Sequence, residues 1–158
     1  MEFTISALVE NHAGVLARLS QIFAGRGFNI TSLTVAETDD PTISRMTIVV
    51  EGDEKVMEQV KKQLNKNIDV IKVYDLTKEK IIDRELLIIK VKADARKRSE
   101  ILEIVDIFRA SIVDVSHNDI TIEATGDTDK INALIKMLKP YGIKEMARTG
   151  KAALARSM

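Results

Sequence analysis

The sequence predicts an α+β protein made of two tandem ferredoxin-like domains, each with the element order strand, helix, strand, strand, helix, strand. Short β-prone segments alternate with segments whose apolar residues recur at helical spacing. This order appears once in residues 1–76 and again in residues 84–158. Residues 77–83 between them are charged and lack a clear period, so we expect a linker there.

In the first half, alternation or runs of β-prone residues predict four strands. Their ranges are 3–9, 29–38, 45–51 and 68–76. The second strand is expected to place Thr31, Leu33 and Val35 on one face, with Ile30, Ser32, Thr34 and Ala36 on the other. Asp39, Asp40 and Pro41 form the expected turn before the third strand.

Two helices are expected between these strands. The first begins at Val15, and Gly25 and Gly27 end it. Its inward face is expected to hold the apolar residues Val15, Leu16, Leu19, Ile22 and Phe23. The second follows Gly52, with Asp53 as its N-cap and with Val56, Val60 and Leu64 directed inward.

The second half repeats this pattern. The expected strands are residues 85–92, 111–116, 119–125 and 143–148, and the expected helices are residues 98–108 and 128–138. His117 and Asn118 form the turn of a hairpin, and Pro140 and Gly142 end the last helix. Residues 151–158 are small and basic, so we expect them to fray.

The composition argues against several classes of function. The chain has 24 Lys and Arg against 24 Asp and Glu, so no net field attracts nucleic acid or an anionic membrane. It contains no cysteine, which excludes disulfides and thiolate chemistry and fits a cytoplasmic protein. The first residues do not resemble a signal peptide, and no apolar run approaches the ~20 residues of a membrane-spanning helix.

The segment from Glu10 to Gly14 is the first candidate binding site. Backbone N–H groups in the first turn of a helix lack intrahelical partners, and the helix dipole adds positive charge there. A carboxylate would therefore sit well at Gly14, Val15 and Leu16. Asn11 could add its amide to such a ligand or could cap the helix, and an ordinary capped helix start explains the same residues.

The second candidate is Asn29, at the start of a strand expected at the edge of the sheet. Its side-chain carbonyl could accept a hydrogen bond from an ammonium group, although an Asn that stabilises a local turn is the simpler interpretation. The basic residues Lys90, Lys92 and 96–98 alternate with apolar neighbours or precede a helix, and no aromatic residues interleave with them for base stacking. A solvated face explains them better than nucleic-acid binding.

No catalytic residues are expected. The sequence lacks phosphate-binding, dinucleotide-binding and zinc-protease motifs. His12 and His117, the two histidines, fall in different halves, so we expect no metal site and no cofactor in this chain.

Residues 1–76 resemble an ACT domain, the small-molecule regulatory module of amino-acid metabolism. The resemblance lies in ENHAGVLARLSQIFAGRGFNITSLTV and TDDPTISRMTIVVEGDEKVMEQVKKQLNK, and the run ETDDPTISRMTIVV is similar more narrowly to the small subunits of acetolactate synthase. The segments DREL, IFRASIVDVS and EMARTGKAALAR resemble the C-terminal domain of that family.

This resemblance implies a non-catalytic subunit that binds a large subunit carrying thiamine diphosphate, magnesium and FAD. It implies activation of that partner and feedback inhibition by valine or another branched-chain amino acid. In the family the effector lies between the ACT domains of a homodimer. One chain would then contribute Asn11, Gly14, Val15 and Leu16, and the other Asn29 and Ile30, with Ala36 at a position sensitive to bulk. His12 and Ala13 depart from the family pattern. A free-standing ACT-type sensor that acts on another protein is the alternative.

Overall fold

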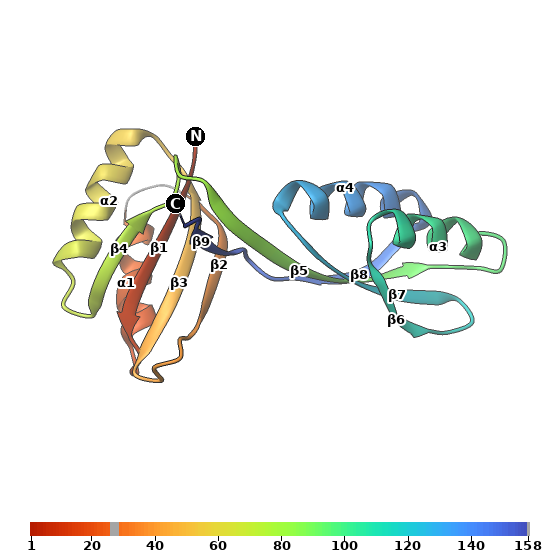
Figure 1. Ribbon diagram of the computed structural model, residues 1–158, viewed down its shortest axis with the longest axis horizontal. Coiled ribbons are helices and arrows are strands. Elements are labelled where there is room, and N and C mark those ends of the chain that lie inside the picture. Colours follow the sequence, from red (N-terminus) through yellow and green to blue (C-terminus); the bar gives the residue numbers. More distant parts are fainter. Residues whose placement is uncertain (26–28, 158) are drawn as a thin grey trace. The chain divides into compact units, whose positions relative to one another are not determined.

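The computed structural model describes residues 1–25 and 29–157 (Figure 1). Contacts within the chain divide it into two compact units. The first consists of Met1–Ile82 with Ala152–Met158, and the second of Asp83–Lys151. No helix in the described part of the chain is long and apolar enough to cross a membrane.

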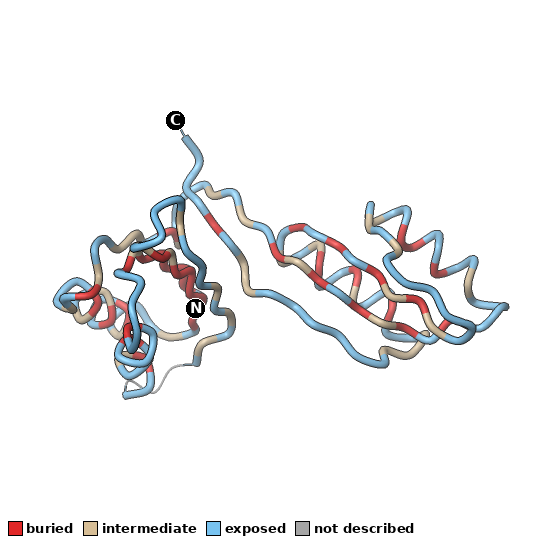
Figure 2. Tube along the Cα trace, turned by 90° about the horizontal axis from the view of Figure 1, so that it is seen from below, coloured by how far each residue is buried: buried red, intermediate tan, exposed pale blue. Residues whose placement is uncertain are grey.

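The first unit is a four-stranded antiparallel sheet with two helices. Its elements are β1 (Glu2–Glu10), α1 (Val15–Ala24), β2 (Asn29–Glu37), β3 (Ile43–Glu51), α2 (Glu54–Lys66) and β4 (Val70–Asp75). The strand order β2-β3-β1-β4 makes β2 and β4 the edge strands. The buried apolar core of this unit comes from β1, β3, α1 and α2, and buried residues are coloured red in Figure 2. The predicted ferredoxin-like arrangement is confirmed.

The helices of this unit confirm the predicted cap of α2 but change the predicted buried face of α1. Asp53 caps α2 as predicted, because its side chain accepts the N–H of Val56 at 2.8 Å. In α1 the buried residues are Val15, Leu19 and Phe23. Leu16 is 47% exposed, so its predicted inward position is wrong. It lies a quarter turn from the stripe that contacts the sheet.

A β-bulge in β2 changes which of its side chains lie on each face of the sheet. The register between β2 and β3 shifts between Ile30 and Ser32, and an extra residue in one strand turns the following side chains over. Ile30 therefore pairs with buried Val50, while Leu33 pairs with buried Ile48. Ile30 lies on the same face as Leu33 and Val35, so the predicted assignment of Ile30 to the opposite face is wrong.

The second unit repeats the first. Its elements are β5 (Ile81–Lys92), α3 (Arg98–Ile107), β6 (Ser111–Val115), β7 (Asp119–Gly126), α4 (Thr128–Leu138), the 3₁₀ helix η1 (Lys139–Tyr141) and β8 (Ile143–Arg148). The order β6-β7-β5-β8 matches that of the first sheet position for position. Apolar residues of β5, β7, α3 and α4 form its core.

Two segments differ from their predictions. β5 begins at Ile81, before the strand start predicted at Glu85. Residues 152–155, which were expected to fray, form the strand β9 (Ala152–Ala155), which pairs with β5. Ala153 is buried, and the N–H of Arg156 donates to the carbonyl of Lys80 at 2.8 Å. Backbone hydrogen bonds thus hold a segment that has little side-chain hydrophobicity.

Candidate functional site at the start of the first helix

Gly14 gives the start of α1 an unusual geometry. It is the N-cap residue and lies in the left-handed region, with φ 86° and ψ −10°. No side-chain hydrogen bond caps α1. The N–H groups of a first helical turn have no carbonyl partners within the helix, and the dipole adds positive charge to them. This end of α1 is therefore suited to an anionic group.

Arg18 adds a full positive charge at the same place. A Cβ atom built on Gly14 would lie 2.9 Å from Nη1 of Arg18, so the guanidinium group covers the glycine. Its Nε donates to Oδ2 of Asp69 at 2.8 Å, which fixes the side chain. Arg18 was not among the predicted site residues, although its position one turn after Gly14 places it over the start of the helix.

Asn11 does not cap the helix. Its Nδ2 donates to the carbonyl of Pro41 at 2.9 Å, and its backbone N–H donates to the carbonyl of Thr42 at 2.8 Å. Both contacts tie the loop after β1 to the turn between β2 and β3. The helix-cap alternative is thus not observed, and Asn11 is exposed.

The remaining predicted residues lie on β2. Asn29 pairs with Glu51 at one end of β3, whereas Glu10 pairs with Ile43 at the other end. Those two ends of β3 are roughly 26 Å apart at about 3.3 Å per residue. Asn29 and Ile30 are therefore distant from Gly14 within one chain. Ala36, paired with Arg45, lies at the near end of the strand.

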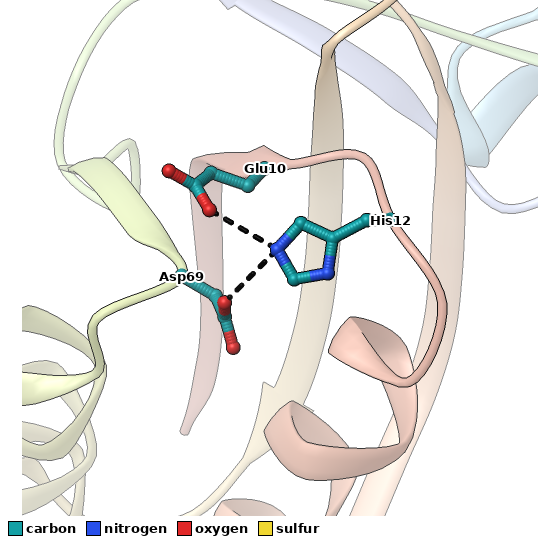
Figure 3. Close-up of side chains that lie close together, drawn as sticks. All are labelled: Glu10, His12 and Asp69. Atoms are coloured by element: carbon teal, nitrogen blue, oxygen red, sulfur yellow. Dashed lines mark hydrogen bonds and ion pairs between the residues drawn. The ribbon is translucent and has the colours of Figure 1, made fainter.

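Glu10, His12 and Asp69 form a second group of side chains beside Gly14 (Figure 3). Nε2 of His12 lies 3.1 Å from Oε2 of Glu10 and 3.3 Å from Oδ1 of Asp69. The Asp69 side chain is only 6% exposed, whereas those of Glu10 and His12 are about half exposed. The group joins the end of β1, the following loop and the residue before β4.

The basic residues of the second unit contact their own unit. Lys90 pairs with Glu145 at 3.2 Å, and Arg98 donates to the carbonyls of Ser116 and His117 at 2.6 and 2.9 Å. Lys97 lies over the ring of Tyr141. Packing within the domain therefore accounts for these charges.

Comparison with known proteins gives concordant matches over both units. Residues 5–72 match the family described as the AHAS small subunit-like ACT domain, and residues 84–157 match the family described as the small subunit of acetolactate synthase. A probable acetolactate synthase small subunit from Archaeoglobus fulgidus is 58% identical over 156 residues, which covers 99% of this chain and 98% of the relative.

Two further relatives agree. The acetolactate synthase small subunit of Aquifex aeolicus is 56% identical and covers 98% of this chain, which in turn covers 81% of that protein. The crystal structure of the acetolactate synthase small subunit from Thermotoga maritima has a TM-score of 0.91 and 41% identity, and the match covers 100% of this chain and 99% of that one.

Proposed function

Since the chain belongs to the acetolactate synthase small-subunit family, whose members are regulatory and non-catalytic, we propose that it binds a branched-chain amino acid at the start of α1. Through this ligand it confers feedback inhibition on the large catalytic subunit, which it otherwise activates. Valine is the effector that we propose to test first. We assign effector binding and dimerisation to residues 1–76, the ACT domain, and we assign residues 84–158 to the C-terminal domain of the family, of which residues 152–158 contact the first unit.

The observation that carries this proposal is the uncapped start of α1. Gly14 carries no side chain, and no side-chain hydrogen bond caps the helix. The Arg18 guanidinium over Gly14 adds a positive charge for the carboxylate of the amino acid. We expect the N–H group of Leu16 and the amide of Asn11 to complete the half-site for that carboxylate. The N–H group of Val15, which was predicted to join them, donates to the carbonyl of His12 at 3.4 Å.

The position of Asn29 supports a site shared by two chains. Within one chain it lies at the far end of β2 from Gly14. If β2 pairs antiparallel with β2 of a second chain, the two ends exchange. Asn29 and Ile30 of one chain then approach Ala36 and the Asn11 loop of the other. The ammonium group would meet Asn29, and the apolar side chain would lie near Ile30 or Leu33.

Exposed apolar residues on β2 also support this dimer. Leu33 and Val35 are on the helix-facing side of the sheet, yet they are 40% and 39% exposed because β2 is an edge strand. Open edges that carry apolar side chains are generally covered in natural proteins. Antiparallel pairing of two β2 strands would join the two sheets and cover these residues.

Calorimetric titration of the purified chain with valine, leucine and isoleucine tests the proposal. A hydrogen bond to a charged group contributes about 1.5–3 kcal/mol, so Asn11→Ala should weaken binding about tenfold or more. Gly14→Asp should abolish binding, because it adds bulk and negative charge at the carboxylate position. Asn118→Ala, an exposed Asn in the second unit, is the control and should bind normally.

The same titration with the catalytic subunit present tests regulation. An effector shifts an equilibrium only if it binds the two states with different affinity, and the coupling must be reciprocal. Valine affinity should therefore change when the catalytic subunit is bound. Binding of none of the three amino acids in either setting would overturn the proposed site. Equal valine affinity in both settings would refute the coupling alone.

A further inference from the structure

We propose that Glu10, His12 and Asp69 form a binding site for a divalent transition-metal ion of the Zn²⁺ or Co²⁺ class. The three side chains offer one imidazole nitrogen and two carboxylate oxygens, and these atoms all lie within 4.8 Å of one another. Figure 3 shows the two carboxylates converging on the same nitrogen of His12.

Two of the three separations between the donor atoms match tetrahedral coordination. Nitrogen and oxygen ligands lie about 2.0–2.1 Å from Zn²⁺, so neighbouring ligands of a tetrahedral ion are roughly 3.3–3.4 Å apart. The observed separations are 3.1 Å from His12 to Glu10 and 3.3 Å from His12 to Asp69. The third pair, the carboxylate oxygens of Glu10 and Asp69, lies within 4.8 Å, so we expect any adjustment on ion binding to fall on this pair.

The frame that holds these ligands is fixed by other contacts. The backbone N–H of Glu10 donates to the carbonyl of Asp69 at 2.8 Å, which joins the two segments. The N–H of Asp69 donates to Oδ1 of Asn67 at 2.9 Å, and Arg18 occupies its Oδ2. Oδ1 of Asp69 is therefore directed toward His12. Such outer contacts orient ligands in metal sites and strengthen binding.

The charges also favour a cation. A neutral imidazole nitrogen carries either one proton or one lone pair, so it cannot donate fully to two carboxylates at once. A cation between the three atoms accepts a lone pair from each. The site holds two carboxyl groups, Glu10 and Asp69, against the one guanidinium group of Arg18. The half-exposed side chains of Glu10 and His12 leave an open side for entry and for water as a fourth ligand.

The mixture of donors indicates the class of metal. Imidazole with carboxylates suits Zn²⁺, Co²⁺ and related ions, whereas Mg²⁺ and Ca²⁺ prefer oxygen ligands alone. The site lies beside the proposed effector loop but does not depend on an amino acid. The sequence indicated no metal site because the two histidines are far apart in the chain. Here one histidine acts with two carboxylates that the β1–β4 register brings together.

The test is calorimetric titration of the full chain, without a polyhistidine tag and without amino acids, with ZnCl₂. We expect one equivalent of Zn²⁺ per chain, and Co²⁺ should give the visible absorption of a tetrahedral nitrogen–oxygen site. His12→Ala and Glu10→Gln should each weaken binding about tenfold or more, as expected when a ligand or its close support is removed. Thermal unfolding of each variant checks that it remains folded.

His117→Ala is the matched control, because His117 is the other histidine of the chain and lies in the second unit. It should bind Zn²⁺ as the parent chain does. Absence of Zn²⁺ binding, unchanged binding in His12→Ala, loss of binding in His117→Ala, or equal affinity for Mg²⁺ would each overturn the proposal. None of these results depends on whether valine binds.

Discussion

Gly14 combines a left-handed backbone with a close neighbour, so we expect that even alanine is unfavourable there. A residue with a Cβ atom at φ 86° is strained by about 1–2 kcal/mol. The new methyl group would also displace the Arg18 guanidinium, whose Nη1 lies 2.9 Å from the Cβ position. Gly14→Ala should therefore lower the free energy of unfolding of the first unit by about 1–2 kcal/mol.

The chain has two tyrosines and no tryptophan, so a single substitution leaves one tyrosine as the fluorescent probe of its unit. With Tyr141 replaced by Phe, the fluorescence of Tyr74 follows denaturant unfolding of the first unit alone. Gly25→Ala is the matched control, because Gly25 has φ −82° and an added Cβ would lie at an ordinary 3.7 Å from the carbonyl oxygen of Gln21. Equal destabilisation by both substitutions would contradict the explanation from backbone strain.

Asp75 makes the stability of the first unit depend on pH in the acidic range. Burial tends to raise the pKa of its carboxyl group, but hydrogen bonds from Thr77 and Lys61 outweigh burial and hold the pKa below the usual 3.8. A depressed pKa means that the carboxylate stabilises the folded state fully above pH 3.8. That contribution is lost as the pH falls through the lower, folded-state pKa.

Asp75→Asn should therefore reduce stability at neutral pH by about 0.2–1 kcal/mol, a modest value because the pair is partly exposed. The difference between parent and variant should shrink as the pH falls below 3.8, as measured by urea unfolding followed through Tyr74. A difference that stays constant across this range would show that the effect does not come from the charge.

Some residues of the candidate site could be predicted from the sequence and others could not. Gly14 was recognisable because a glycine before a helical apolar pattern has a local structural meaning. Asp69 was not, because it falls inside the strand predicted at residues 68–76, whereas β4 begins at Val70. Its role arises from contact with Arg18, 51 positions away, and from the pairing of β4 with β1. Leu16 was misplaced because one apolar residue at the border of a helical stripe can face either side.

At the scale of elements, the exposed edge of β2 predicts self-association. Leu33→Lys would place a charge among residues that two β2 strands would bury, and the few central residues that dominate an interface cost about 2 kcal/mol or more when they are changed. We expect the dimer to dissociate at least about tenfold more readily. Light scattering across a dilution series measures this change.

Ile71→Lys is the matched control for that experiment. Ile71 is 52% exposed on β4, the opposite edge strand of the same sheet. It should leave the dimer unchanged. If it disrupts the dimer as strongly as Leu33→Lys, or if the parent chain is monomeric, pairing through β2 is wrong.

Local signals predicted most elements well. Strand alternation, the Asp53 cap and the apolar periodicity of α3 and α4 all act within a few residues, so a single sequence carries them. The bulge in β2 was not predictable, because an alternating pattern does not show where one residue leaves the ladder. The predicted break in the helix at Gly27 lies outside the described residues.

At the scale of the whole molecule, the repeated order of elements predicted two sheets of the same topology. The strand formed by residues 152–155 was not predictable from this repeat. β9 has the sequence AALA, without alternation or strong β propensity. Its structure depends on partners far away in the chain, and its contacts place it with the first unit and not with the second-unit residues that precede it.

Removal of residues 152–158 tests how much β9 stabilises the first unit. Truncation after Lys151 exposes the surroundings of buried Ala153 and removes the hydrogen bond between Arg156 and Lys80. The loss of a few hydrogen bonds and a small apolar contact should destabilise the first unit by about 1–2 kcal/mol. Tyr74 fluorescence in the Tyr141→Phe background should report an earlier unfolding transition. In the complementary Tyr74→Phe background, Tyr141 should report a smaller shift for the second unit. A larger shift for the second unit would mean that β9 stabilises mainly the domain that precedes it in sequence.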